Sequence, residues 1–153
     1  MKTGLQISLQ DQSRAKTIRT LLVDDSPFML KILTQILARE DGFTVVGAAV
    51  NGRQAIEYAV TQSPDLILMD FDMPLLNGAT ATQYIKHLAA PPIIFIVTSD
   101  DSSSSRIICK AAGADAYIVK SADFSAQLGS KLQAWFGSTS DGTRHGENQS
   151  ERP

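Results

Sequence analysis

The sequence contains a single cysteine, Cys109, among its 153 residues. One thiol excludes an internal disulfide and a zinc site built from several cysteines, and it is typical of a protein from a reducing compartment. The chain also lacks any apolar run near the roughly 18 residues that a membrane-spanning helix requires. Its polar N-terminus has no apolar signal-peptide core. These absences predict a cytoplasmic protein.

An excess of one charge is missing as well. The chain has 14 Lys and Arg residues against 16 Asp and Glu residues, which gives a formal net charge of −2 at pH 7, and the two signs are mixed along the sequence. A protein that binds nucleic acid as its primary ligand usually has a basic stripe. We therefore expect neither a nucleic acid nor a membrane as a direct partner.

Both ends of the chain lack hydrophobic periodicity. Residues 1–16 are largely polar, and residues 137–153 contain no apolar side chain. Such segments cannot bury enough apolar surface to offset the entropy lost on ordering. We predict a flexible N-terminal leader over 1–16, one folded domain over 17–136 and a disordered tail over 137–153, with no output domain after it.

The folded part contains short apolar runs that end in polar residues. The run that ends in Asp70 is unbroken from Pro64, apart from Asp65, which is typical of a parallel strand buried on both faces. Similar runs cover 18–23, 43–49, 93–97 and 116–119, and they alternate with segments of helical periodicity. The pattern predicts an α/β fold: a doubly wound, five-stranded parallel sheet of order 2-1-3-4-5, as in flavodoxin-like proteins.

The helices between these strands have recognisable starts. Ser26 followed by Pro27 predicts the cap and first residue of the first helix, and Asp123 is the expected cap of the last. Serine hydroxyls compete for backbone hydrogen bonds, so the run 102–105 should weaken the start of the fourth helix and give local mobility. The second helix is expected to bury Ile56, Ala59 and Val60.

Polar side chains follow four of the predicted strands at the same edge of the sheet. They are Asp24 and Asp25 after the first strand, Asp70 after the third, Thr98 after the fourth and Lys120 after the fifth. These strands are neighbours in the predicted order, so the side chains should gather in one pocket. Two like unit charges about 4 Å apart repel by about 4 kcal/mol at an effective dielectric constant of about 20. Such a pocket therefore requires a cation in addition to Lys120.

Oxygen ligands favour Mg²⁺ as this cation. We predict that Asp25 and Asp70 bind it directly and that Asp24 binds it directly or through water. Asp70 can then act as the nucleophile in phosphoryl transfer, while the metal and Lys120 offset charge on the phosphoryl oxygens and the Thr98 hydroxyl donates a hydrogen bond. The resulting acyl phosphate is open to hydrolysis, so the modification should be transient.

Four motifs at the strand ends resemble the receiver domain of two-component response regulators, in its chemotaxis-type single-domain form. They are VDDSPFM at 23–29, MDFDMPLLNG at 69–78, IVTSDD at 96–101 and GADAYIVK at 113–120, and the resemblance covers roughly 18–136. It implies that Asp70 is the phosphoacceptor, Thr98 the signalling hydroxyl and Lys120 the phosphate partner. It also implies a metal site of Asp24, Asp25, Asp70 and the backbone carbonyl of Asp72, with Tyr117 as the switch aromatic.

The resemblance implies a phosphorylation-controlled binding module rather than an enzyme. A phosphohistidine donor, either a sensor histidine kinase or a histidine phosphotransfer protein, would phosphorylate Asp70 with Mg²⁺. The domain would promote its own phosphorylation and dephosphorylation. Inward movement of Thr98 and Tyr117 would then change the surface formed by the fourth helix, fifth strand and fifth helix, which would bind a separate effector protein.

Two positions depart from the family pattern. Ser121 follows Lys120, where the family usually has proline after a cis bond. Because a cis bond before a residue other than proline costs about 3 kcal/mol, we predict a trans bond and an altered loop. Ser99 stands where alanine is common and adds a hydroxyl beside the phosphate site.

Two other functions are compatible with these residues. Asp70-Phe71-Asp72 also resembles the DxD motif of haloacid-dehalogenase-like phosphatases, in which the first Asp is the nucleophile and the second the general acid. Turnover of phosphate esters would favour that enzyme, whereas one stoichiometric phosphoryl group would favour the receiver. A flavodoxin-like electron carrier that uses 102–105 as a phosphate loop is the third possibility, and a colourless protein would argue against it.

Overall fold

The computed structural model describes residues 16–137, in which five strands and five helices alternate. The predicted leader and tail lie outside these residues except for Lys16 and Gly137, so the division into leader, domain and tail stays a prediction. The strands are β1 (Ile18–Val23), β2 (Phe43–Ala49), β3 (Leu66–Met69), β4 (Ile93–Thr98) and β5 (Ala116–Val119). The helices are α2 (Pro27–Ala38), α3 (Gly52–Gln62), α4 (Gly78–Lys86), α5 (Ser103–Ala112) and α6 (Phe124–Phe136).

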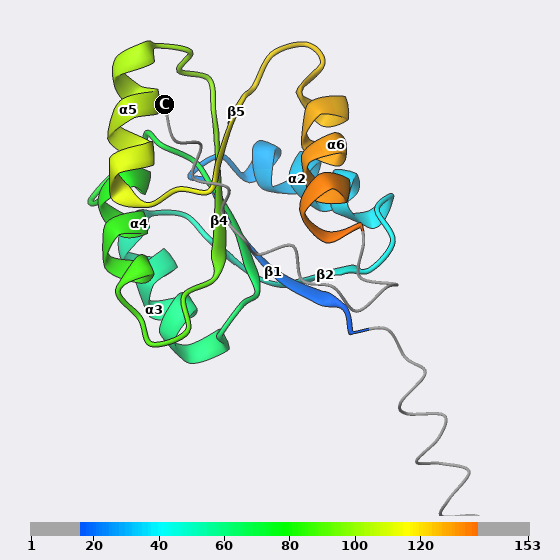
Figure 1. Cartoon of the computed structure of the whole chain (residues 1–153), viewed down its shortest axis with the longest axis horizontal. Coiled ribbons are helices and arrows are strands. Elements are labelled where there is room, and N and C mark those ends of the chain that lie inside the picture. The colour runs from blue at the N-terminus through cyan, green and yellow to red at the C-terminus, as the bar shows by residue number, and fades with distance from the viewer. Residues whose placement is uncertain (1–15, 138–153) are drawn as a thin grey trace, which may run out of the picture.

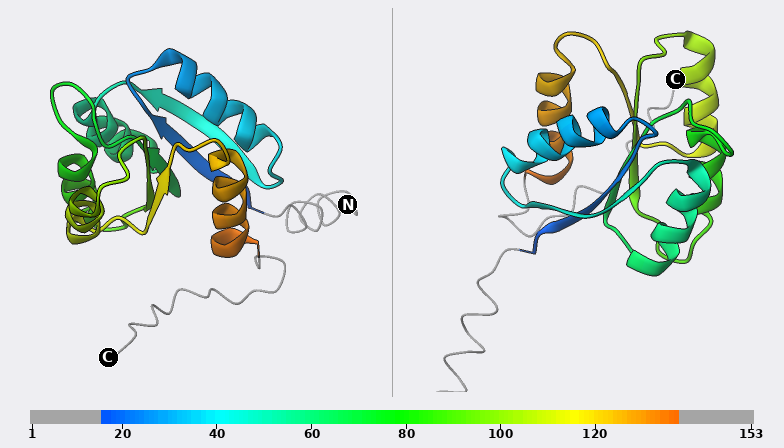
Figure 2. Two further views of the ribbon diagram at one scale, coloured as in Figure 1. Left: turned by 90° about the horizontal axis from the view of Figure 1, so that it is seen from above. Right: turned by 180° about the vertical axis from the view of Figure 1, so that it is seen from behind.

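All five strands are parallel and form one sheet in the order β2-β1-β3-β4-β5, which confirms the predicted topology. Helices α3, α4 and α5 cover one face of the sheet, and α2 and α6 cover the other (Figures 1 and 2). Each face has its own apolar core: Leu21 belongs to one and Leu22 to the other, because successive strand residues point to opposite faces. Every residue of β3 is fully buried, which explains its unbroken apolar sequence.

Both predicted cap residues precede their helices, but only one of the two side chains caps its helix. Ser26 caps α2 by accepting a hydrogen bond from the Met29 N–H, with Pro27 at the first helical position. Asp123 lies at the start of α6, but its side chain does not cap the helix. Its carboxylate instead accepts hydrogen bonds from Ser121 Oγ at 2.7 Å and Gln127 Nε2 at 3.0 Å, so these neighbouring side chains replace the backbone N–H as its donors.

Two further local expectations have different outcomes. Val60 is 58% exposed, so its predicted burial is wrong, and Ala55 joins Ala59 on the buried face of α3. Residues 55 and 59 are four apart and share one side of the helix, whereas residue 60 is rotated away from it. Ser102 caps α5 by accepting from the Ser105 N–H at 3.3 Å, so the serine run begins this helix. The local mobility expected there stays a prediction.

The connection after β5 has a trans bond between Lys120 and Ser121, as predicted, since residues 16–137 contain no cis peptide bond. The Ser121 N–H donates to the Val119 carbonyl at 2.7 Å, which turns the chain tightly at Lys120. Within the described part of the chain, no helix combines the length and apolar character needed to cross a membrane.

Candidate functional site

The candidate site lies at the edge of the sheet where the parallel strands end. Backbone hydrogen bonds continue the strand pairing by one residue at three of its positions. The Asp24 N–H donates to the Ala49 carbonyl at 3.0 Å, the Asp70 N–H to the Val23 carbonyl at 2.9 Å, and the Lys120 N–H to the Thr98 carbonyl at 2.7 Å. The sheet itself therefore positions these residues.

Three carboxylates gather at this edge. Asp24, Asp25 and Asp70 each place a carboxylate oxygen within 4.8 Å of the other two. Asp24 and Asp70 are buried, with exposed fractions of 1% and 7%, whereas Asp25 is exposed. The predicted convergence of these acids is therefore present. The exposed side chain of Asp72 is not part of this group.

Lys120 reaches both buried carboxylates. Its Nζ atom lies 2.7 Å from Asp24 Oδ2 and 3.4 Å from Asp70 Oδ1. The other oxygen of Asp24 accepts the Ser26 N–H at 2.9 Å, so both oxygens of this carboxylate already have donors. One ammonium group serves two buried acids, and the three-carboxylate group keeps a surplus of negative charge.

Burial and the neighbouring charge change the acidity of Asp70. Burial, with a contribution from the charge on Asp24, raises the pKa of the Asp70 carboxyl group from 3.8 to about 6. Lys120 and the Phe71 N–H, which donates to Asp70 Oδ1 at 2.9 Å, oppose the shift but do not cancel it. A cation bound to the carboxylate would favour its charged form, which a nucleophile requires.

Two glycines hold the loop that follows Asp70 against the site. The Gly78 N–H donates to the Phe71 carbonyl at 2.8 Å, and the Gly52 N–H donates to the Leu76 carbonyl at 3.1 Å. A side chain at Gly78 would collide with the backbone carbonyl of Asp70, and one at Gly52 would collide with that of Leu76. Both helices must therefore begin with glycine if the loop is to lie this close to Asp70.

Thr98 and Tyr117 are linked through the backbone of Asp100. Thr98 is buried, and its Oγ1 accepts the Asp100 N–H at 3.3 Å, which leaves its own proton available for donation. The Tyr117 hydroxyl donates to the Asp100 carbonyl at 2.5 Å. Burial, followed by the charge of Asp100, raises the pKa of Tyr117 to about 12, so its hydroxyl remains a donor at neutral pH.

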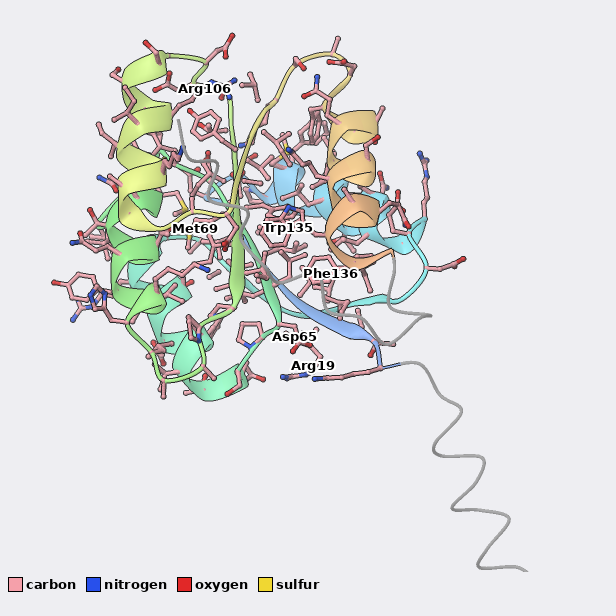
Figure 3. All side chains as sticks on the ribbon, in the orientation of Figure 1. Arg19, Asp65, Met69, Arg106, Trp135 and Phe136 are labelled. Atoms are coloured by element: carbon pink, nitrogen blue, oxygen red, sulfur yellow. The ribbon has the colours of Figure 1, made fainter. Side chains whose placement is uncertain are left out.

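Sequence reasoning did not identify Asp100 or Arg106 as parts of this arrangement. The guanidinium carbon of Arg106 lies 4.7 Å from the centre of the Tyr117 ring, and the same side chain pairs with Asp101 at 2.9 Å. Arg106 lies at the end of α5 nearest this edge of the sheet (Figure 3). A cation at one position of a serine-rich helix start is not a distinctive pattern, so the sequence contained little to reveal this contact.

Comparison with known sequences gives a match over most of the chain. Residues 20–130 match the family model of the response regulator receiver domain. A protein-glutamate methylesterase/protein-glutamine glutaminase from Caldanaerobacter subterraneus subsp. tengcongensis is 44% identical over 81 residues, which are 53% of this chain and 22% of that protein. A counterpart from Methanospirillum hungatei is 41% identical over 102 residues, 67% of this chain and 29% of that protein. The matched segments thus span less than a third of these relatives.

Solved structures give the same match in three dimensions. The response regulator domain of Thermotoga maritima CheB has a TM-score of 0.69 and 35% identity, covering 78% of this chain and 92% of that one. A LuxR-family two-component response regulator from Aurantimonas sp. has a TM-score of 0.73 and 30% identity, covering 78% and 84%. The CheX–CheY complex with BeF3 and Mg²⁺ from Borrelia burgdorferi has a TM-score of 0.70 and 26% identity, covering 78% and 90%.

Proposed function

The chain belongs to the response regulator receiver family, and from this premise we propose that Asp70 accepts a phosphoryl group from a phosphohistidine donor in a Mg²⁺-dependent reaction. Receiver domains are signalling domains, and membership confirms the resemblance inferred from the four motifs. The observation that supports the proposal most is the group of three carboxylates that shares Lys120 at the carboxyl edge of the sheet.

The residues at this edge fit a magnesium ion. Mg²⁺ prefers oxygen ligands and usually keeps several waters, so it needs few protein ligands. We assign Asp25 and Asp70 as direct ligands. Asp24 acts through water, because its two oxygens already accept the Ser26 N–H and Lys120, and the backbone carbonyl of Asp72 is the further ligand. When bound, the ion would neutralise negative charge on the phosphoryl oxygens.

The chain's own residues supply the rest of the chemistry. Asp70 Oδ1 is held by the Phe71 N–H and lies near Lys120, so the other carboxylate oxygen attacks the phosphorus atom. The phosphorus–nitrogen bond of the donor breaks, and its imidazole leaves with the bonding electron pair and takes up a proton. Lys120 pairs with a phosphoryl oxygen, and the Thr98 hydroxyl donates to another. Water later cleaves the acyl phosphate and restores Asp70.

The proposed output is binding to a separate effector protein in the cytoplasm, without direct contact to nucleic acid or membrane. The donor is a sensor histidine kinase or a histidine phosphotransfer protein. This interpretation makes the receiver domain a phosphoacceptor rather than an enzyme. The methylesterase relatives are named for an activity of much longer proteins, and that activity is not assigned to this chain.

Intact-mass measurement after incubation with acetyl phosphate and Mg²⁺ tests this function. We expect one base-labile phosphoryl group on the parent protein, none on Asp70→Asn, and one on the matched control Asp41→Asn, which neutralises an exposed acid between α2 and β2. An unlabelled parent or a labelled Asp70→Asn would contradict the proposal. Repeated turnover of a phosphate ester would favour the phosphatase alternative, although the DxD motif of that family lies on the first strand, whereas Asp70 follows the third strand of this sheet.

A further inference from the structure

The loop between β4 and α5 is organised around one residue, Asp100. Its N–H donates to Thr98 Oγ1 at 3.3 Å, and its carbonyl accepts the Tyr117 hydroxyl at 2.5 Å. Its carboxylate accepts the Ser102 N–H at 2.8 Å through one oxygen and the Ser105 hydroxyl through the other. Asp100 therefore connects the signalling hydroxyl, the switch aromatic and the first turn of α5.

Ser105 differs from the other serines at this helix start. It is 6% exposed, whereas Ser103 and Ser104 are exposed. Its hydroxyl also accepts a hydrogen bond from Ser102 Oγ at 2.9 Å, so it is held on both sides. The hydrogen bonds from Ser105 and Ser102 lower the pKa of the Asp100 carboxyl group, and the one from the Ser105 hydroxyl contributes most. The carboxylate therefore remains a charged acceptor. A hydrogen bond to a charged group is stronger than one between neutral groups.

We propose that Ser105 is a positioning residue that couples the Thr98 hydroxyl to helix α5 through the side chain of Asp100. This inference rests on the proposed function, in which a phosphoryl group on Asp70 draws the Thr98 hydroxyl toward it. The Asp100 N–H follows Thr98, and the Asp100 carboxylate then pulls on the Ser105 hydroxyl. Because Ser105 lies within α5, the displacement moves the first turn of the helix.

The next helix residue reinforces this connection. Arg106 pairs with Asp101 at 2.9 Å and covers the Tyr117 ring at 4.7 Å, so it links α5 to the loop and to β5. Ile107 and Ile108 follow immediately and are 68% and 52% exposed. A shift of the first turn therefore moves two exposed apolar side chains, which can change the affinity of this helix for a partner protein.

Hydrogen–deuterium exchange of the full chain, with and without acetyl phosphate and Mg²⁺, tests the coupling. Phosphoryl addition is followed by intact mass in the same samples. In the parent we expect phosphorylation to change the exchange of residues 102–109. In Ser105→Ala we expect phosphoryl addition equal to that of the parent but a phosphorylation-dependent exchange difference reduced by about tenfold, since loss of a hydrogen bond to a charged group changes an equilibrium by about that factor.

Ser103→Ala is the matched control, because it removes an exposed hydroxyl from the same turn, and it should behave as the parent. The double variant Asp100→Ala/Ser105→Ala should lose at least as much coupling as Ser105→Ala alone, because it also removes the acceptor of the Ser102 N–H. A parent-like exchange difference in Ser105→Ala, or one restored to the parent level in the double variant, would overturn the inference while the proposed function stands. Absent labelling of the parent would defeat the function, and the inference with it.

Discussion

The two ends of the sheet use acidic residues in different ways. At the amino end of the strands, Asp65 accepts the Arg19 N–H at 2.9 Å, and Asp115 accepts both the Ile94 N–H at 2.8 Å and Lys86 Nζ at 2.6 Å. Each of these acids comes just before a strand and binds the backbone of the neighbouring strand. Arg19 and Asp65 lie together at this end, opposite Arg106 (Figure 3). These acids hold adjacent strands in register.

At the carboxyl end the acids outnumber their partner. Asp24, Asp25 and Asp70 form one group, and Lys120 is the cation that contacts its two buried members. Burial and the neighbouring charge raise the pKa of Asp70 to about 6. An acid whose charge is matched by local donors supports the fold, whereas a buried surplus of charge destabilises the fold unless a ligand balances it. The comparison thus separates acids with matched charge from a crowded group of acids within a single sheet.

The largest expected effect on stability lies at the amino end. Asp115→Ala should lower the free energy of unfolding by about 3 kcal/mol, because the Ile94 N–H loses its side-chain acceptor and the partly buried Lys86 ammonium loses its carboxylate partner and keeps only the Pro92 carbonyl. Urea denaturation monitored by circular dichroism measures this change. Asp41→Ala, at an exposed acid, should change stability by less than about 0.5 kcal/mol. A loss below about 1 kcal/mol for Asp115→Ala would show that this acid contributes little to the stability of the fold.

Asp70→Asn should have the opposite effect and raise the free energy of unfolding. Without Mg²⁺ at pH 7.5, the variant should be more stable than the parent by on the order of 2 kcal/mol, because it removes a buried charge whose pKa is raised from 3.8 to about 6. As pH rises from 3.8 to about 6, the unfolded carboxyl group ionises first, so the parent should lose stability over this range. Denaturation curves at pH 4, 6 and 7.5 would show this decline in the parent and not in the variant. An unchanged difference across that range would contradict the assignment.

Binding of Mg²⁺ should offset the destabilisation that the crowded carboxylates cause at the carboxyl end of the strands. At a metal concentration about ten times the dissociation constant, binding should stabilise the parent by about 1.4 kcal/mol. The expected increase in melting temperature should be reduced in Asp25→Asn, which loses a direct ligand. It should persist in Asp65→Asn, whose acid lies at the other end of the sheet. Equal stabilisation of both variants by Mg²⁺ would mean that the carboxyl-edge acids do not hold the metal.

The smallest effect is expected for Asp72→Asn. The Asp72 side chain is exposed and outside the three-carboxylate group, so its charge acts on the site through solvent. We expect Mg²⁺ affinity, or the lifetime of the phosphoryl group, to change by roughly twofold to threefold. Titration calorimetry and the decay of the labelled mass measure the two quantities. Identical values for the variant and the parent would show that only the backbone at this position can matter.

The order of the strands was predictable because short apolar runs alternate with segments of helical periodicity along the chain. The unbroken run before Asp70 required a strand covered on both faces, and residues after parallel strands must meet at one edge. Side-chain partners were less predictable. Asp123 satisfies the usual preference for a helix cap, yet a serine and a glutamine nearby supply its donors. The preference of aspartate for helix starts does not take account of such competing side-chain donors.

The proposed coupling between Thr98 and α5 also depends on side-chain partners that the sequence does not predict. Ser105 was visible in the sequence only as one of four consecutive serines, and each of them is an acceptable helix-start residue. Its selection depends on burial and on the position of Asp100, which the tertiary structure determines. The roles of the metal-binding and phosphoryl-binding residues stay predictions that rest on the family and on the charge imbalance.

The close approach of Gly52 and Gly78 to the segment after Asp70 also limits how regulators of this kind can be recombined. Main-chain contacts hold that segment near both of its ends, so a graft of different length would displace Asp70 itself. The segment after Thr98 is tied to its helix mainly through side chains. To change partner specificity, the segment after Thr98 is therefore the one to exchange. The segment after Asp70 should be transplanted only intact, together with Gly52 and Gly78.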